Sequence, residues 1–243
     1  MTALYDRIGL NYADLRRPDP RIAAPIHAAL GDAKSVLNIG AGTGSYEPLD
    51  RQVIAIEPSS EMIAQRRHPA AQVIQASAEA IPLPDNHVDA AMGILTLHHW
   101  TDQAQGLAEV RRVTRGPIVL LTFDPTFADH WLLDYFPANF DLDAAQFPRL
   151  EHYSDWLGDV EIANIPIPHD CTDGFLYAYW RRPHAYLDPR LRAASSTFHR
   201  ITGIDEGVAR LQTDLDNGTW ADRHGHLLEQ DTMDCGYRLV IAR

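Results

Sequence analysis

Glycines that follow an apolar run, together with a later glutamate, are the strongest chemical signal in this sequence. Residues 36–39 lead directly into Gly40, Gly42 and Gly44. Glycines at such a position allow a tight turn and let a ligand approach the backbone where a Cβ atom would clash. Glu57 ends the next apolar run, and a carboxylate there can accept hydrogen bonds from both hydroxyls of a ribose. Together they predict an adenosine-type ligand, in preference to a purely structural turn.

The spacing within the loop separates the candidate ligands. A dinucleotide fingerprint places its third glycine where this chain has Ser45. A phosphate-binding loop needs a lysine followed by serine or threonine, but the only lysine is Lys34. Pro48 also interrupts the helix after the loop, which suits a ligand without phosphate. A nicotinamide-dependent reductase is therefore a less favoured alternative.

His98 and His99 follow the fourth predicted strand and are the candidates for a catalytic base. Imidazole titrates near neutral pH, so it can take a proton from a phenol or hydroxyl. Neighbouring side chains diverge, and we expect only one of the two, with His98 favoured, to face a substrate. The alternative is that both cap the following helix and pack on Trp100.

Two other groups of reactive side chains are weaker candidates. His224 and His226, with Asp222 nearby, have a spacing that could hold a divalent ion, but flexible surface histidines explain it more simply. Residues 169–171, His-Asp-Cys, lack the partner order of a known cysteine nucleophile. We predict no metal site, and a structural loop at residues 169–171.

Strand-like and helix-like segments alternate through residue 125. The predicted strands are five short apolar runs, at residues 35–39, 52–56, 71–75, 88–95 and 117–123. The predicted helices, from capping and periodicity, lie at 59–67 and 101–113. This order is typical of an α/β fold with a parallel sheet and helices on both faces. Ligands bind such sheets beyond the carboxyl ends of the strands, where the strand order reverses.

The second half of the chain departs from this alternation. Further strands are predicted at residues 160–167 and 236–242, and residues 175–230 are predicted to be mostly helical. Aromatic residues are dense between 126 and 159. Four of them could form a lid over a substrate, although the ordinary core of an insertion is the favoured interpretation: Trp131, Tyr135, Phe136 and Trp156.

Basic residues gather between residues 175 and 200, where Asp188 is the single acid. The five arginines are Arg181, Arg182, Arg190, Arg192 and Arg200. A solvated helical face is the favoured explanation. The alternatives are recognition of an acidic or phosphorylated substrate group, or a subunit contact such as a homodimer would need.

The composition excludes several classes of partner. The 243 residues include 21 Lys and Arg against 33 Asp and Glu, a net charge of −12, so no nucleic-acid partner is expected. No apolar run approaches the length that spans a bilayer and no signal peptide is evident, so no membrane partner is expected either. Two cysteines are too few for a disulfide scaffold, which favours a reducing cytoplasm.

The run from Val36 to Ser45 resembles motif I of the class I S-adenosylmethionine-dependent methyltransferases, in the type 11-like group that acts mostly on small molecules. Four more stretches are similar to the family's ribose motif, adenine loop, fourth-strand entry and following helix, at 54–59, 75–82, 85–91 and 107–112. The N-terminal Tyr5, Asp6 and Tyr12, with Arg16 and Arg17, resemble more weakly the flap that closes over the cofactor. The main resemblance covers residues 35–125.

The fold that this resemblance implies is a Rossmann-like, mostly parallel seven-stranded sheet with helices on both faces. It implies a single domain, residues 1–243, that begins with a flap at 1–34 and continues with a cofactor-binding half at 35–125. Helical and aromatic insertions in the C-terminal half, at 126–159 and 175–230, would cover the substrate.

The implied cofactor is S-adenosyl-L-methionine, and the implied reaction is in-line transfer of its methyl group to oxygen, nitrogen or carbon of a small-molecule acceptor. The cofactor-binding residues that it implies are Tyr12, Gly40, Ala41, Gly42, Gly44, Glu57, Pro58, Met62, Ala78, Glu79, Gly93 and Leu95.

One residue departs from the family pattern. Asn38 stands where the family usually has an acid, and an amide adds no charge near the cofactor ammonium. It is the one feature that favours the alternative of a binding or non-methylating protein on the same fold. A nucleic-acid methyltransferase is disfavoured, because Gly93-Ile94-Leu95-Thr96 replaces that group's Asn-Pro-Pro-Tyr after strand four.

Overall fold

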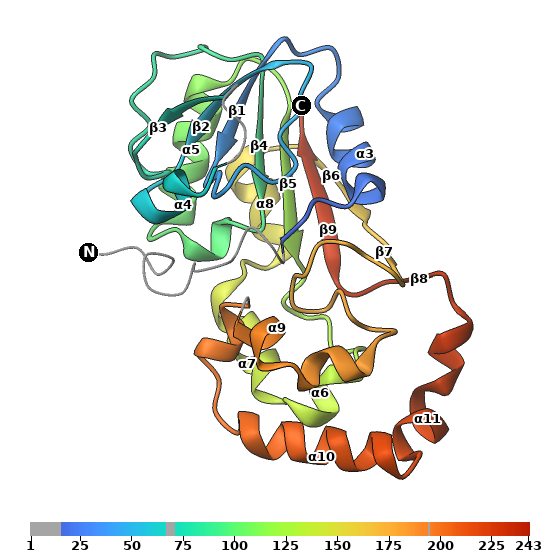
Figure 1. The fold of residues 1–243 in the computed structure, drawn as a ribbon. Coiled ribbons are helices and arrows are strands. Elements are labelled where there is room, and N and C mark those ends of the chain that lie inside the picture. The colour runs from blue at the N-terminus through green and yellow to red at the C-terminus, as the bar shows by residue number, and fades with distance from the viewer. Residues whose placement is uncertain (1–15, 67–70, 194) are drawn as a thin grey trace.

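Seven strands form one sheet in the computed structural model, which describes residues 16–66, 71–193 and 195–243 (Figure 1). In chain order they are β1 (Ser35–Ile39), β2 (Gln52–Ile56), β3 (Ala71–Ile74), β4 (Ala90–Ile94), β5 (Ile118–Phe123), β6 (Val160–Asn164) and β9 (Tyr237–Ala242). Their order across the sheet is β3-β2-β1-β4-β5-β9-β6. Strands β1 to β5 pair in parallel, whereas β9 runs antiparallel to both β5 and β6. The predicted α/β fold with a mostly parallel seven-stranded sheet is confirmed.

Helices cover both faces of this sheet. On one face α3 (Pro20–Ala29) buries Ile22 and Ile26. On the other, α5 (Gln103–Val113) and α8 (Leu150–Leu157) pack against the sheet. Within β5, Val119 joins the first of these clusters and Leu120 the second. A central strand buried on both sides explains why residues 118–123 show no polar alternation.

Local signals set the helix starts near the site. The Ser59 hydroxyl accepts a hydrogen bond from the backbone of Met62 at 3.2 Å and begins α4 (Ser60–Ala64). Asp102 caps α5 in the same way. The loop from Gly40 runs through turns to β2, so the short helix expected before Pro48 does not form. The order of strands reverses between β1 and β4, so the carboxyl ends of these two strands face a crevice.

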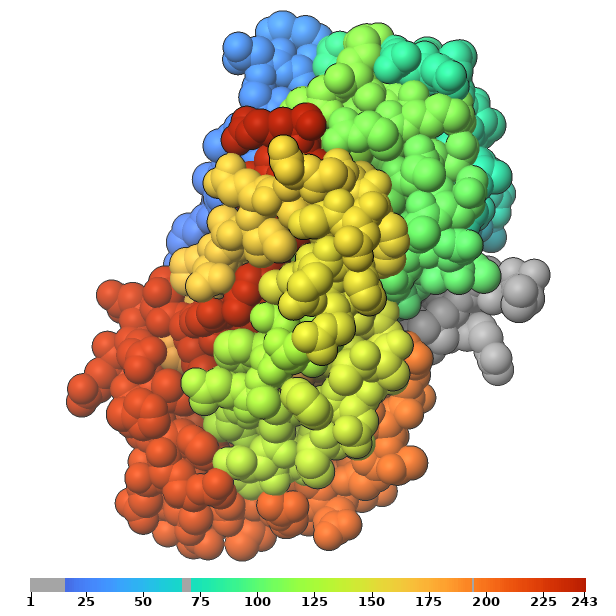
Figure 2. Space-filling model, turned by 180° about the vertical axis from the view of Figure 1, so that it is seen from behind, coloured from blue at the N-terminus to red at the C-terminus, as the bar shows by residue number. Residues whose placement is uncertain are grey.

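The second half forms a mainly helical region beyond the carboxyl end of the sheet (Figures 1 and 2). Its α-helices are α6 (Leu132–Tyr135), α7 (Ala138–Gln146), α9 (Pro189–Ala193), α10 (Ile204–Asp216) and α11 (Thr219–His224). Of the 3₁₀ turns in the described residues, those at Pro183–Leu187, Thr197–His199 and Gly225–Glu229 belong to this region, whereas Leu97–His99 follows β4. Strand β7 (Ile167–Pro168) pairs with β8 (Thr232–Met233). Trp131, Tyr135 and Phe136 are buried in its core, in agreement with the core interpretation of these aromatic residues.

Among the described residues, no helix has the length and apolar character that crossing a bilayer requires.

The arginines between residues 175 and 200 do not form one patch. Arg190 pairs with Asp188. Three others donate to backbone carbonyl oxygens: Arg181, Arg182 and Arg192. The fifth, Arg200, donates to the side-chain oxygen of Gln146 on α7.

A buried ion pair ties the N-terminal segment to the second half. The carboxylate of Asp173 has no exposed surface, pairs with Arg16 and accepts a hydrogen bond from the Tyr46 hydroxyl at 2.9 Å. Asp19, also fully buried, caps α3 and accepts from the backbone of Thr172 at 3.1 Å. The loop around residue 173 is therefore held against both α3 and the glycine loop.

Replacing Asp173 by asparagine should lower the free energy of unfolding by about 3 kcal/mol, because it removes the negative charge that pairs with the largely buried Arg16 guanidinium. Urea denaturation measures the change. The matched control is Asp170→Asn. Asp170 pairs with Arg21, but its side chain is 58% exposed, so this variant should unfold almost as the wild type does. Equal losses in the two variants would contradict a special role for the buried pair.

Candidate functional site

A cavity of about 460 Å³ lies at the carboxyl ends of β1, β2 and β4. Its walls come from the loops after these strands and from the loop after β3. The volume is that of a typical small-molecule or cofactor site. The lining includes eleven of the predicted site residues, namely Gly40, Ala41, Gly42, Glu57, Pro58, Met62, Ala78, Glu79, Leu95, His98 and His99.

The glycine loop forms one side of this cavity because side chains would not fit. Gly40 has φ of 61°, and a Cβ atom there would lie 1.8 Å from the Thr96 hydroxyl oxygen. Gly42 has φ of 52°, again a conformation that favours glycine. The bare backbone thus leaves a cradle against which a ligand can lie closely.

Glu57 is held in a fixed orientation by backbone groups. One carboxylate oxygen accepts from Gly42 N and the other from Ser59 N, each at 2.8 Å. The side chain lines the cavity although the residue is only 6% exposed. A carboxylate can accept more than two hydrogen bonds, so this group fits two adjacent hydroxyls of a ribose. The glycine cradle and the carboxylate together fit an adenosine-type ligand.

A buried ion pair supports the loop from below. Asn38 donates to a carboxylate oxygen of Glu47 at 2.9 Å, and Arg66 pairs with the same carboxylate at 2.6 Å. Arg66 also donates to the carbonyl oxygen of Gly42 at 3.0 Å. The sequence showed the missing acid at Asn38 but not that Glu47 places a carboxylate beside it.

The remaining predicted residues lie elsewhere. Gly44 sits over the Glu47–Arg66 pair, where a Cβ atom would approach the carboxylate to 3.0 Å. Gly93 lies inside β4, packed between Leu120 and other core side chains, and Tyr12 falls outside the described residues. Other lining residues fall in the predicted flap or motifs without having been named as binding residues: Arg16, Asn38, Thr43, Ser45, Ser59 and Ser77. The lining residues outside those stretches are Ile94, Thr96, Trp100 and Thr101.

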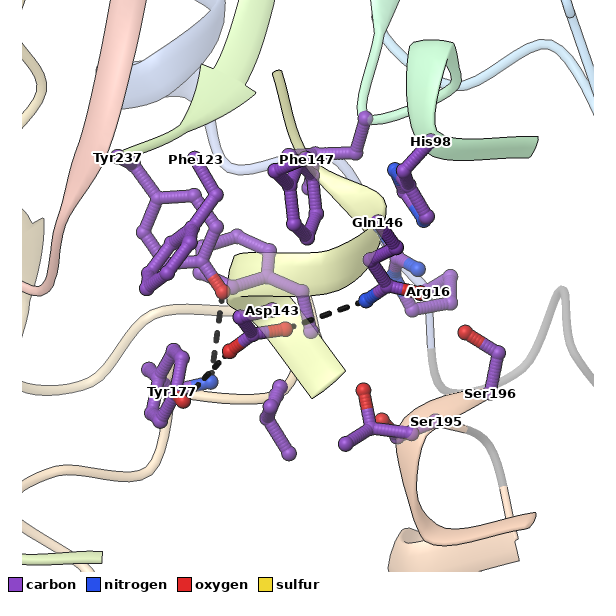
Figure 3. Close-up of a pocket in the computed structure, with 14 residues that line it drawn as sticks. Arg16, His98, Phe123, Asp143, Gln146, Phe147, Tyr177, Ser195, Ser196 and Tyr237 are labelled. Atoms are coloured by element: carbon purple, nitrogen blue, oxygen red, sulfur yellow. Dashed lines mark hydrogen bonds between the residues drawn. The ribbon is translucent and has the colours of Figure 1, made fainter. Parts of the chain in front are cut away.

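A second cavity, of about 60 Å³, adjoins the first and shares Arg16, Leu95 and His98 with it (Figure 3). Its walls are largely aromatic, and α7 and the segment 195–197 add polar groups. The aromatic lining residues are Phe123, Phe147, Phe175, Tyr177 and Tyr237. These residues are scattered over more than 100 positions of the chain, so the site could not be predicted from a local motif. Neither this cavity nor the larger one is lined by the four aromatic residues of the predicted lid.

His98 stands at the boundary of the two cavities. Its Nδ1 atom is buried and has no hydrogen-bond partner among the described residues. Its ring centroid lies 4.3 Å from that of Phe147 and 3.8 Å from that of His99. Burial, reinforced by the neighbouring His99, holds the pKa of His98 well below its usual value. The imidazole is therefore neutral at pH 7 and can accept a proton.

His99 differs from His98 in position. It lines only the larger cavity, and burial lowers its pKa to about 4. Arg200 and Arg16 lower the pKa of both imidazoles further by charge repulsion.

A buried carboxyl group faces the aromatic cavity from α7. Asp143 is 3% exposed and accepts hydrogen bonds from the Tyr177 hydroxyl at 2.8 Å and from Gln146 Nε2 at 3.2 Å (Figure 3). Burial raises the pKa of Asp143 to about 6. The group is therefore still mostly ionised at pH 7.

The other reactive groups of the sequence lie apart from these cavities. Cys171 is buried, and burial raises the pKa of its thiol to about 12, so it is no nucleophile at neutral pH. The Nε2 atom of His224 lies 3.2 Å from a carboxylate oxygen of Asp134. Within the described ranges, no three His, Cys, Asp or Glu side chains converge as metal ligands.

Known proteins resemble this chain over the same region and beyond it. A family model described as a methyltransferase domain matches residues 37–117. A protein of Mycobacterium tuberculosis assigned as an S-adenosylmethionine-dependent methyltransferase is 35% identical over 99 residues, which are 38% of this chain and 36% of that protein. The demethylmenaquinone methyltransferase of Renibacterium salmoninarum is 35% identical over 101 residues, or 38% of this chain and 43% of the enzyme. This chain thus matches well under half the length of these curated relatives.

A solved structure extends the similarity to the whole chain. A protein of Anabaena variabilis, assigned as a methyltransferase from an antibiotic biosynthesis pathway, is 35% identical, with a TM-score of 0.88. The match covers 94% of this chain and 99% of the other. The strand order, the glycine cradle and the carboxylate after β2 agree with that relationship. This chain belongs to the class I S-adenosylmethionine-dependent methyltransferases.

Proposed function

We propose that this protein transfers a methyl group from S-adenosylmethionine, bound in the larger cavity, to a small molecule bound in the aromatic cavity. The observation that carries the proposal is the shared boundary of the two cavities at Arg16, Leu95 and His98. A donor and an acceptor placed on either side of this boundary would meet there. Such placement is the main contribution that a protein makes to a displacement reaction.

The residues of the larger cavity would each hold a different part of the cofactor. The backbone at Gly40 and Gly42 would lie against it, Glu57 would bind the ribose hydroxyls, and Ala78 and Glu79 would flank the adenine. When bound, the cofactor supplies an electrophilic methyl group.

His98 is the proposed base. Its Nδ1 has no hydrogen-bond partner among the described residues, and the side chain lines both cavities, which suits removal of a proton from the acceptor as the new bond to the methyl group forms. His99, which does not reach the aromatic cavity, is the less favoured candidate.

The small size of the aromatic cavity and the chain's net charge of −12 support a small-molecule acceptor rather than a nucleic acid. The free, buried thiols of Cys171 and Cys235 support function in a reducing cytoplasm. A homodimer stays a prediction from sequence.

Replacing Glu57 by alanine should weaken binding of S-adenosylhomocysteine about tenfold, the scale of hydrogen bonds to a charged group. Isothermal titration measures the affinity. Glu61→Ala removes the same charge from the adjacent helix α4, outside the cavity lining, and should bind as the wild type does. The cofactor assignment would be wrong if the wild-type protein bound no S-adenosylhomocysteine, or if Glu57→Ala bound it equally well.

The transfer itself can be tested with labelled cofactor. We expect wild-type protein to move the methyl label onto at least one member of a panel of phenolic, amino and carboxylate metabolites. His98→Ala should slow this transfer by about 10²-fold or more, the contribution of a general base, without losing S-adenosylhomocysteine binding. The matched variant His99→Ala should lose less. A larger loss in His99→Ala would reverse the assignment of the base.

The neutral state of His98 has a consequence for stability. The unfolded chain binds a proton at this histidine below about pH 6.5, whereas the folded protein holds the imidazole neutral to lower pH. Because the unfolded state binds this proton more readily, the free energy of unfolding decreases as the pH falls. Urea denaturation at pH 8 and pH 5 should show His98→Leu gaining stability relative to the wild type at the lower pH.

The exposed His152 on α8 offers a matched control. Its replacement by leucine should change stability by the same amount at both pH values. If the difference between His98→Leu and the wild type were also the same at both, His98 would bind its proton equally well in the folded and unfolded states, and burial would not keep it neutral.

A further inference from the structure

The carboxylate of Asp143 has no cationic partner among the described residues. Its two hydrogen-bond donors, the Tyr177 hydroxyl and the Gln146 amide, are both neutral. The nearest cation along this network is Arg200, whose guanidinium donates to the oxygen of Gln146 and not to Asp143. Gln146 thus separates the two charges and fixes the carboxylate in place.

An ionised carboxylate buried in this way is costly. Removing a charge from water is unfavourable unless an opposite charge compensates it. Two neutral donors satisfy part of the hydrogen-bonding capacity of Asp143, but a carboxylate can accept about four bonds. A cationic group in the cavity would supply both the missing charge and further donors.

The walls of the cavity favour the same kind of ligand. Phe123 and Tyr177 stack with their centroids 5.3 Å apart, and Phe175 and Tyr237 meet at 4.6 Å. Aromatic faces attract cations electrostatically, and ammonium groups are often bound among several such rings. A carboxylate behind these aromatic walls adds a directed hydrogen bond to that attraction (Figure 3).

Arg16 at the boundary is the feature that could instead favour an acidic acceptor. Its charge is already balanced by the buried carboxylate of Asp173. Asp143 is therefore the charge in the aromatic cavity that lacks a direct ion-pair partner among the described residues. The volume of about 60 Å³ admits a head group of a few heavy atoms, with the rest of the molecule reaching toward Leu95 and His98.

We propose that the methyl acceptor carries a basic nitrogen, and that its ammonium group binds Asp143 within the aromatic cavity. This inference rests on the proposed function, since it assigns a chemical class to the acceptor. The binding that it requires can nevertheless be measured without any methyl transfer.

Three ligands that share an isobutyl group and differ in their polar end test the proposal: isobutylamine, isobutanol and isovalerate. Each is titrated by protein-observed NMR into the full chain saturated with S-adenosylhomocysteine. The amine should bind at least about tenfold more tightly than the alcohol or the acid, the scale of a charge-assisted hydrogen bond. Asp143→Asn should abolish this preference while its affinity for S-adenosylhomocysteine, which also reports on folding, stays the same.

Tyr177→Phe is the matched control, because it removes a neutral donor from Asp143 and keeps the carboxylate. It should retain the preference for the amine. Any of four outcomes would overturn the proposal. These are equal binding of the three ligands, no binding of any of them, tightest binding of isovalerate, and survival of the preference for the amine in Asp143→Asn. Failure of S-adenosylhomocysteine to bind would instead count against the proposed function, and the same titrations without it would still report on Asp143.

Discussion

The site depends on one buried carboxylate, that of Asp173. It binds Arg16 from the N-terminal segment and the Tyr46 hydroxyl from the glycine loop, and it belongs to the second half of the chain. Three segments that are distant in sequence therefore share one charge centre. Because an unpaired buried charge is strongly unfavourable, these segments hold one another in place. Arg16 is thereby fixed at the boundary of the two cavities.

The charges around the two cavities are arranged by the same physical rule. Glu47 is neutralised by Arg66 beneath the glycine loop, and Glu57 is held by backbone donors. Glu47 also explains how the fold accommodates Asn38, since the acid missing from that position is present one contact away. The carboxylate of Asp143 differs in that both of its hydrogen-bond donors are neutral, and this difference is the basis of the acceptor class proposed above.

The topology of the sheet explains why the aromatic cavity forms where it does. Strand β9 inserts antiparallel between β5 and β6 and places Tyr237 opposite Phe123 at the carboxyl end of β5. Helix α7 brings Asp143 to the same place, and the segment before the 3₁₀ turn at Pro183–Leu187 brings Tyr177. The first half of the chain thus supplies most of the larger cavity, the proposed cofactor site, and the second half supplies most of the aromatic cavity, the proposed acceptor site. This division fits a family in which one fold acts on many substrates.

Much of the cofactor side could be predicted because its signals are local. A glycine loop after one buried strand and an acid after the next are adjacent in the sheet, since neighbouring parallel strands end at the same edge. Strand and helix positions through residue 123 followed from periodicity and caps for the same reason. The roles of Gly44 and Gly93 were harder to assign, because some of the side chains that a Cβ atom would crowd are distant in the sequence. These are Arg66 for Gly44 and Leu120 for Gly93.

The lining of the aromatic cavity could not be predicted, because only the packing of distant segments brings it together. Asp143, Tyr177 and Tyr237 have no spacing that links them, and their meeting follows from the antiparallel insertion of β9 and the packing of the helical region. Burial also decided the protonation states, because identical imidazole and carboxyl groups at the surface would titrate normally. Local signals along the chain were enough to predict the fold and the type of cofactor, whereas the three-dimensional packing determined which charged groups line the aromatic cavity.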